Sequence, residues 1–230
     1  NVQSYIGLGE VYRARGDVEQ AISNFKSVLL LDSTYADAHI KLGNVYQDSE
    51  QLDEAVDAFQ QAVALQPENG WYRLLLGDAL TADAQTDKAL EAYAEAARLQ
   101  SDYLQDPAYY LRLAATYLAA GRLDEALTQA QQAEQTALAA GESGEGALQF
   151  QGDILREQAS WQGAVDLYQR VLAINPERTQ AMRGLALALE AQGRNQEAIV
   201  QWRAYIRQAP RGEYADEARE HLRKLRASAG

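Results

Sequence analysis

The sequence predicts an all-α fold, a solenoid in which antiparallel helix pairs repeat along the chain. The first observation behind this prediction is a pattern of six positions that recurs after 34 residues. Its first two copies read Tyr5, Leu8, Gly9, Tyr12, Ala21, Phe25 and His39, Leu42, Gly43, Tyr46, Ala55, Phe59. The second observation is that each copy holds two amphipathic stretches, with apolar residues at i, i+3, i+4 and i+7, separated by a turn. One pair cannot bury its apolar face alone, so successive pairs must stack.

Six copies of the pattern account for nearly the whole chain, and they predict a single domain over residues 1–230. The repeats span residues 2–35, 36–69, 70–103, 107–140, 145–178 and 179–212. Residues 213–227 form an amphipathic capping helix, whose Tyr214, Ala218, Leu222 and Leu225 would cover the sixth pair. No such helix precedes Asn1, and the sequence does not begin with Met. We therefore expect the chain to be a piece of a longer protein.

The pattern resembles the tetratricopeptide repeat, in which a bulky residue, Leu-Gly, Tyr, Ala, an aromatic residue and Pro stand at these offsets. The resemblance extends over most of the chain, because all six repeats keep the spacing. It implies a right-handed superhelical solenoid, a tetratricopeptide-like α-α superhelix, that acts as a protein-protein interaction scaffold. It also implies that the first helix of each pair lines a concave groove, with its second, fifth, ninth and twelfth residues pointing inward.

The inward positions predict a groove that binds a peptide or protein segment. The fifth positions of the first four repeats are aliphatic, and several ninth positions are acidic. Such a stripe suits apolar side chains of an extended or helical peptide, and the carboxylates favour basic residues in it. The alternative is that neighbouring helices cover the stripe. The predicted groove consists of Ile6, Glu10, Ile40, Asn44, Trp71, Leu74, Asp78, Leu111, Asp153 and Arg183.

The fourth repeat departs from the pattern. Asp106 and Pro107 are typical of an N-cap and a first helical residue. Ala130 replaces the expected aromatic residue, and the second helix of this repeat should be longer than the others. The acidic, glycine-rich residues 141–146 that follow predict a hinge. A phosphate-binding loop is disfavoured there, because the Gly-Lys-Ser/Thr ending of such loops is absent.

Catalytic, cofactor and metal sites are not predicted, and we expect no enzyme activity. The chain has 230 residues and no cysteine, which excludes thiol catalysis and cysteine-ligated metals. His39 and His221 lie in different elements without the spacing of a catalytic or metal site; packing is the favoured role of His39, and His221 lies in the capping helix. The acidic residues between Asp48 and Glu54 lack the glycine and closing glutamate of a calcium loop.

Charge and hydropathy restrict the partners. The net charge is −12, with an acidic excess in residues 1–103 and a basic excess in residues 178–230. An acidic field repels phosphate backbones, so we expect no nucleic acid partner. The apolar runs are too short to span a bilayer, so we expect no direct membrane insertion. The chain as given favours a cytoplasmic location, and an upstream signal or anchor stays open.

Two other functions remain open at this point. In the first, the acidic half of one copy meets the basic end of the next, which would give a salt-sensitive homo-oligomer. In the second, the chain is the docking arm of a larger protein whose catalytic domain lies elsewhere. Otherwise the expected partner is a protein or peptide with apolar and basic residues.

Overall fold

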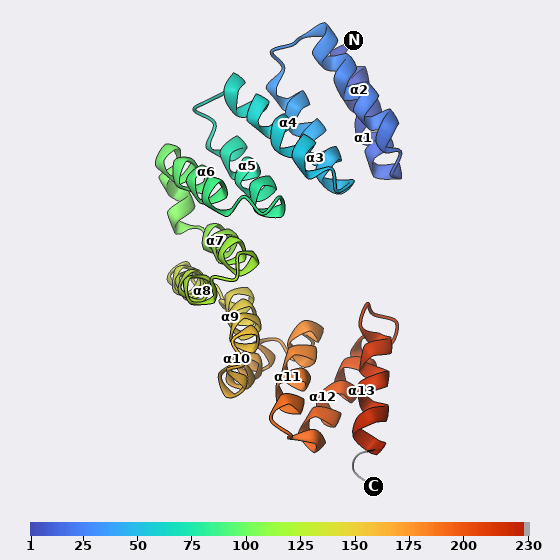
Figure 1. The fold of residues 1–230 in the computed structure, drawn as a ribbon, viewed down its shortest axis with the longest axis vertical. Coiled ribbons are helices and arrows are strands. Elements are labelled where there is room, and N and C mark those ends of the chain that lie inside the picture. Colours follow the sequence, from blue (N-terminus) through green and yellow to red (C-terminus); the bar gives the residue numbers. More distant parts are fainter. Residues whose placement is uncertain (228–230) are drawn as a thin grey trace. The chain divides into compact units, whose positions relative to one another are not determined.

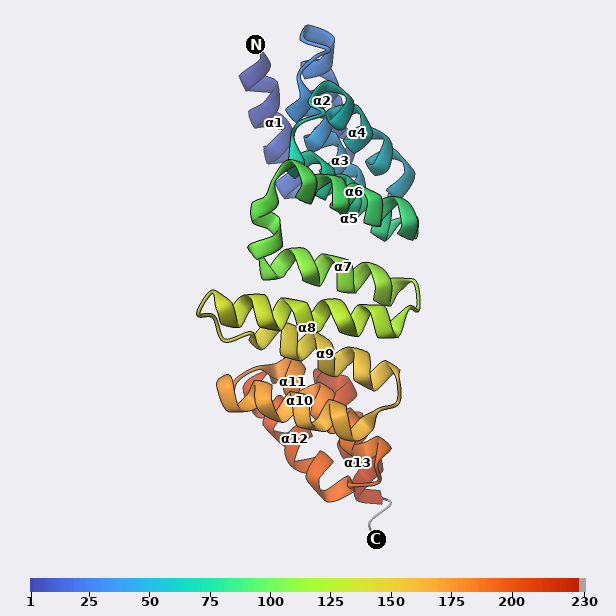
Figure 2. The same cartoon turned by 90° about the vertical axis from the view of Figure 1, so that its left-hand side faces the viewer.

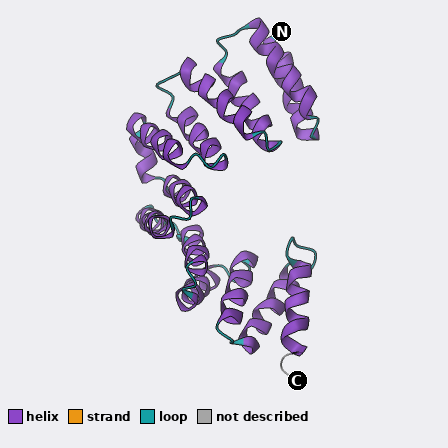
Figure 3. Cartoon of the chain, viewed as in Figure 1, coloured by secondary structure: helices purple, strands orange, loops and turns teal. Residues whose placement is uncertain are grey.

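The computed structural model of the protein describes residues 1–227. These residues form helices joined by short turns, without a strand among them (Figure 3). The predicted all-α fold is confirmed. Residues 228–230, which the predicted domain includes, lie outside the described residues.

The chain divides into two compact units, unit 1 (residues 1–104) and unit 2 (residues 105–230), and the division falls between the third and fourth predicted repeats. Both units consist of successive helix pairs (Figure 1). Unit 1 contains α1 (Val2–Arg15), α2 (Val18–Leu31), α3 (Ala36–Asp48), α4 (Leu52–Leu65), α5 (Gly70–Ala82) and α6 (Thr86–Leu99). A short 3-10 helix, η1 (Ser101–Gln105), spans the boundary. Unit 2 contains α7 (Pro107–Ala119), α8 (Leu123–Ala139), α9 (Glu145–Glu157), α10 (Trp161–Ile174), α11 (Thr179–Ala191), α12 (Asn195–Gln208) and α13 (Ala215–Ala227).

Glycines in the first helix of a pair make room for an aromatic ring from the second. A Cβ added at Gly43 would lie 2.7 Å from the Phe59 ring, and one at Gly77 would lie 2.5 Å from the Tyr93 ring. Real Cβ atoms do not come so close, so only hydrogen fits at these two glycines. In the fourth repeat Ala114 replaces the glycine and Ala130 replaces the aromatic residue, and both belong to one buried cluster. The larger residue in one helix is thus matched by a smaller one in the other.

The turn inside each pair requires a left-handed residue at one repeat position. Gly16 has φ 78° there, whereas Ala84 has φ 57° at the equivalent position. A residue with a Cβ pays about 1–2 kcal/mol for this conformation. We expect Ala84→Gly to raise the free energy of unfolding by about 0.5–1 kcal/mol, because the relief of strain exceeds the entropy that glycine adds to the unfolded chain. Urea unfolding measures the change, and Gly16→Ala should shift stability in the opposite direction.

The N-cap of the first helix and the greater length of the second helix in the fourth repeat agree with the sequence prediction. The Asp106 carboxylate accepts a 2.8 Å hydrogen bond from the backbone N–H of Ala108, and Pro107 is the first helical residue. α8 has 17 residues, three more than the 14 of α10 or α12 (Figure 2). Residues 140–144 then connect α8 to α9, with Gly141 and Gly144 at positive φ, and the last two residues of the predicted 141–146 segment already belong to α9. The hinge at these residues stays a prediction.

The predicted capping helix corresponds to α13, which begins two residues later than predicted. Its buried Ala218, Leu222 and Leu225 belong to the same cluster as Trp202 and Tyr205 of α12. The opposite side of α13 bears charged residues exposed to solvent. The helix therefore covers apolar surface of the sixth pair with a polar exterior.

Candidate functional site

Two members of the predicted groove are core residues. Ile40 and Leu74 have 9% and 2% of their surface exposed. The expectation of an open aliphatic stripe is therefore wrong at these two positions. The stacked helices of unit 1 cover both side chains, which agrees with the alternative that neighbouring helices cover the stripe. Ile6 of unit 1 and Leu111 of unit 2 are partly buried. Trp71, with 47% exposed, is the predicted apolar residue that remains open.

The predicted polar residues of unit 1 are engaged with neighbouring helices. Glu10 of α1 accepts a hydrogen bond from Lys41 of α3. The hydroxyl of Tyr93 in α6 donates to the Asp78 carboxylate of α5 over 2.8 Å. Asn44 of α3 is partly buried. Glu10 therefore joins two first helices, and Asp78 joins the two helices of one pair.

In unit 2, Asp153 of α9 accepts hydrogen bonds from two buried groups. The Tyr168 hydroxyl lies 2.7 Å from its Oδ1, and the Gln149 Nε2 lies 3.2 Å from its Oδ2. Burial, followed by the Asp153 charge, raises the pKa of the Tyr168 hydroxyl far above its ordinary value. Tyr168 therefore stays protonated and keeps donating to Asp153.

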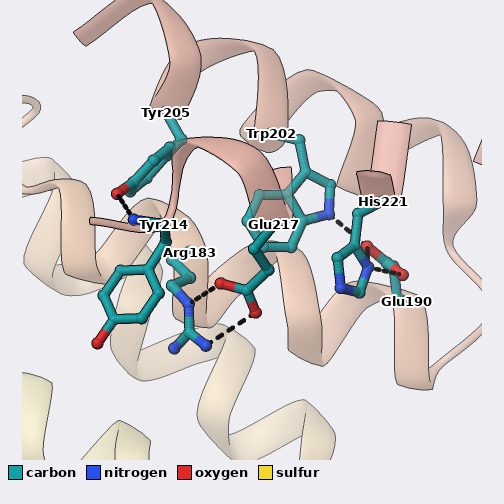
Figure 4. A network of polar contacts seen from close by, with 7 residues as sticks. All are labelled: Arg183, Glu190, Trp202, Tyr205, Tyr214, Glu217 and His221. Atoms are coloured by element: carbon teal, nitrogen blue, oxygen red, sulfur yellow. Dashed lines mark hydrogen bonds and ion pairs between the residues drawn. The ribbon is translucent and has the colours of Figure 1, made fainter. Parts of the chain in front are cut away.

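Arg183 of α11 is held by the capping helix. Its Nε and Nη2 donate to the two carboxylate oxygens of Glu217 over 2.7 and 2.9 Å, and its guanidinium lies 4.1 Å from the centre of the Tyr214 ring (Figure 4). The Glu217 hydrogen bond raises the pKa of Arg183. Beside this pair, Glu190 accepts from the Trp202 indole and contacts His221 (Figure 4). The predicted groove residue Arg183 thus fixes α13 to α11.

We expect loss of this pair to loosen the capping helix. In Glu217→Gln the bidentate ion pair becomes a weaker neutral contact, so amide exchange in α13 should speed up by about tenfold, equivalent to about 1.4 kcal/mol. Hydrogen-deuterium exchange over residues 215–227 measures the effect. Glu220→Gln is the matched control, because Glu220 and Lys224 form a solvent-exposed pair in the same helix that contributes little. Equal exchange in the two variants would contradict the prediction.

The turn-side ends of α7, α9 and α11 form two neighbouring cavities, which we call the α7–α9–α11 surface. The first has a volume of about 460 Å³ and the second about 400 Å³. The first is lined by Leu118, Gly121, Leu123, Asp153, Arg156 and Glu157. The second is lined by Arg156, Glu157, Ala159, Trp161, Leu187 and Ala191. Arg156 and Glu157 of α9 line both cavities and separate their apolar walls.

The guanidinium of Arg156 is only partly satisfied by the protein. Its Nη2 lies 3.2 Å from a carboxylate oxygen of Glu157. Its Nε is buried and has no hydrogen-bond partner within the described part of the chain. A donor left in this state costs free energy until an acceptor reaches it. This unpaired donor lies inside the wall between the two cavities and is shielded from solvent.

The α7–α9–α11 surface combines apolar walls with charged side chains. Apolar walls from Leu118, Leu187 and Trp161 surround one cation and the carboxylates of Asp153 and Glu157. Over residues 1–227, no cluster of His, Cys, Asp and Glu is arranged to hold a metal ion. Over the same residues, no helix is both long and apolar enough to cross a membrane.

The sequence prediction included Asp153 but missed the other residues of this surface. Leu118 and Arg156 occupy twelfth positions of first helices, which the resemblance already placed inward, so that position was the signal that could have found them. Leu123, Ala159 and Trp161 lie at or beside the turn within a pair, outside the first helices to which the groove prediction was limited. Of the predicted residues Asp153 and Arg183, which both lie in unit 2, only Asp153 lines a cavity.

Family models match three parts of the chain. A model described as TPR repeat matches residues 9–49, and two described as tetratricopeptide repeat match residues 36–69 and 151–213. A search of the curated proteins finds no match.

Solved structures share the fold at low sequence identity. Yeast Tom70 superposes with a TM-score of 0.74 at 21% identity, over 100% of this chain and 47% of Tom70. PilF of Pseudomonas aeruginosa gives 0.68 at 18% identity, over 99% and 97% of the two chains. YrrB, whose structure is described as a TPR protein with an unusual peptide-binding site, gives 0.57 at 24% identity, over 80% and 91%. The chain spans about half the length of Tom70.

The recurrent spacing, the stacked helix pairs and the family models agree with one another. This fold supports a general role as a protein-interaction scaffold with protein or peptide partners, and proteins of this kind are typically not catalytic. The chain belongs to the tetratricopeptide repeat family.

Proposed function

We propose that the chain is a non-catalytic scaffold that binds a segment of another protein on the α7–α9–α11 surface. The observation that supports this proposal is the pair of cavities on the two sides of Arg156, each with apolar walls. Cavities of about 460 and 400 Å³ can each accept a large apolar side chain. A segment that fills both must pass over Arg156, whose guanidinium would donate to its backbone carbonyls.

The charges of this surface favour a partner with a basic residue. Asp153 and Glu157 are acidic, and Arg156 is the single base among the lining residues. An apolar segment with a Lys or Arg next to its anchoring side chains would therefore match the surface better than an acidic one. YrrB shares the fold and is described as binding peptides at an unusual site, which is consistent with peptide binding by this architecture.

The other predicted groove residues have different roles in this proposal. Trp71 is the exposed anchor that unit 1 offers, and the partly buried Ile6, Glu10, Asn44 and Asp78 belong to the same unit. Leu111 and Asp153 belong to unit 2, and Arg183 contributes by holding α13. We place the primary contact on the α7–α9–α11 surface, because there the cavities and the incompletely paired arginine coincide.

A displayed library of random peptides tests this proposal even while the partner is unidentified. Peptides selected on the wild-type chain should contain two apolar residues and a basic one. Their dissociation constants, measured by fluorescence polarisation, should rise by about tenfold or more in Ala191→Trp, because the indole would fill the second cavity. Ala191 is exposed at the end of α11, so the substitution leaves the core intact.

The matched control is Ala14→Trp, which places the same side chain at the same repeat position of unit 1. Ala14 is also exposed and lies outside both cavities. The selected peptides should bind Ala14→Trp with wild-type affinity. The proposal fails if Ala191→Trp and Ala14→Trp bind the peptides equally well.

A second candidate function is self-association, which the uneven charge distribution favours. Residues 1–103 have an excess of acids and residues 178–226 an excess of bases, so copies could attract one another between these regions. Light scattering should then show an oligomer in low salt that dissociates in about 0.5 M salt, where the Debye length is only a few ångströms. A monomer at every salt concentration would exclude this function.

A further inference from the structure

The first helix exposes apolar residues along one face. In α1, Leu8 and Val11 have 47% and 48% of their surface exposed, and the adjacent Tyr5 has 36%. Leu8 and Val11 are three residues apart and therefore neighbours on one side of the helix. Scattered exposed apolar residues are normal on protein surfaces, but three within two turns of one helix form a patch.

The same repeat positions are buried in α3, α9 and α11, and in α5 and α7 the equivalents of Leu8, Leu76 and Leu113, are partly buried. In α3, the equivalents of Leu8 and Val11 are Leu42 and Val45, with 4% and 1% exposed. In α11 they are Leu185 and Ala188, with 2% and 0% exposed. In each case the second helix of the preceding pair packs on the face, α2 on α3 and α10 on α11. α1 therefore presents the face of an internal helix without the helix that covers such a face.

The covering helices share a pattern that defines the missing partner. In α2, Ile22, Phe25 and Leu29 belong to the cluster that includes Leu42 and Val45. The pattern is an aliphatic residue at position i, an aromatic residue at i+3 and an aliphatic residue at i+7. Among the other second helices that are followed by a helix of their own unit, it recurs in α4, α10 and α12 and is absent from α8. These sets are Val56, Phe59, Val63 in α4, Val165, Tyr168, Leu172 in α10 and Ile199, Trp202, Ile206 in α12. The exception, α8, has Leu127, Ala130 and Glu134.

These second helices leave no such face open for a second copy of the chain. α2, α4, α8, α10 and α12 are each packed against the helix that follows in their own unit. The outward side of α13 bears Asp216, Glu220 and Arg223, all exposed. Charged residues would lose their hydration against Leu8 and Val11, so α13 of another copy is a poor cover.

We propose that the Leu8–Val11 face of α1 is a docking surface for a further tetratricopeptide pair, whose second helix bears the aliphatic-aromatic-aliphatic pattern. This surface is separate from the α7–α9–α11 surface. The two ends of the described chain then differ in kind: the α13 end is closed by charged residues, and the α1 end accepts another helix.

An added helix pair tests the proposal directly. A copy of residues 36–69, which contain α3 and α4, is fused in front of Val2 of the full chain. This copy ends where residue 69 precedes Gly70, so it reproduces the natural spacing between α4 and the next first helix. Its Val56, Phe59 and Val63 should then cover Leu8 and Val11. We expect amide exchange in α1 to slow by about tenfold or more relative to the unfused chain.

Two variants of the fusion distinguish this contact from a nonspecific effect. Leu8→Gln with Val11→Gln should abolish the protection of α1, and the unfused double variant should fold like the wild type because both side chains are half exposed. Leu30→Gln is the control, since Leu30 is 88% exposed on α2, and it should retain the protection. The proposal is overturned if the fusion leaves exchange in α1 unchanged or if the Leu8→Gln, Val11→Gln fusion keeps the protection. It is also overturned if light scattering shows that the unfused chain dimerises and that the double substitution abolishes the dimer, because the occupant is then a second copy.

Discussion

Trp202→Ala is expected to lower the free energy of unfolding of unit 2 by about 3–5 kcal/mol. Trp202 is fully buried, its ring stacks on His221 at 4.9 Å between centroids, and its indole N–H donates to Glu190. Its removal leaves a large cavity between α12 and α13 and deprives Glu190 of a donor. Urea unfolding followed by circular dichroism measures the loss, and hydrogen-deuterium exchange should locate it in α11, α12 and α13.

Trp71→Ala is the matched control for this substitution. Trp71 is half exposed on α5, so the same truncation should cost less than about 1 kcal/mol. Stacked helix pairs depend on their neighbours, so the Trp202→Ala transition should broaden as unit 2 loses cooperativity. A similar loss of stability in the two variants would mean that Trp202 does not have the structural role assigned to it.

Gly43→Leu is expected to destabilise unit 1 by about 1–3 kcal/mol or more, because the added side chain has no room. An ideal Cβ at this position lies 2.7 Å from Cε1 and Cζ of the buried Phe59. The ring cannot move outward without displacing other core residues, so α3 and α4 must separate. Thermal unfolding of the full chain should show the lower stability, and amide exchange should increase in both helices.

Gly7→Ala, at another helical glycine of unit 1, is expected to raise stability, whereas Gly43→Leu lowers it. Nothing lies within 4 Å of a Cβ added at Gly7. Alanine there gains helix propensity without a clash, so stability should rise by about 0.5–1 kcal/mol. If Gly43→Leu and Gly7→Ala change the unfolding temperature in the same direction, close packing of Phe59 on Gly43 is not what holds this pair together.

The sequence alone was sufficient to predict the fold because its strongest signals are steric. A glycine opposite an aromatic ring, as in Gly43 and Phe59, tolerates few substitutes, and stacking repeats this requirement in successive pairs. The N-cap at Asp106 was equally predictable, since its carboxylate acts on an amide two residues away. Such local features do not depend on how distant parts of the chain are placed.

The exposure of individual groove residues could not be predicted in the same way. Ile40 and Leu74 occupy an inward-facing repeat position, but neighbouring helices decide whether that position remains open. The cavities beside Arg156 depend on how turn residues such as Ala159 pack against the ends of neighbouring helices, which the sequence does not reveal. The repeat position of a residue therefore indicates the direction of its side chain, and only the packed structure shows whether that side chain is accessible.

The measurement that tests the central claim most directly is hydrogen-deuterium exchange of the chain with and without a peptide selected from the random library. If the α7–α9–α11 surface is the binding site, the bound peptide should protect the amides at the ends of α7, α9 and α11 and in the turns at Gly121 and Ala159. The rest of unit 2 and all of unit 1 should exchange as before. Protection confined to unit 1, or to the α13 end of unit 2, would contradict the account.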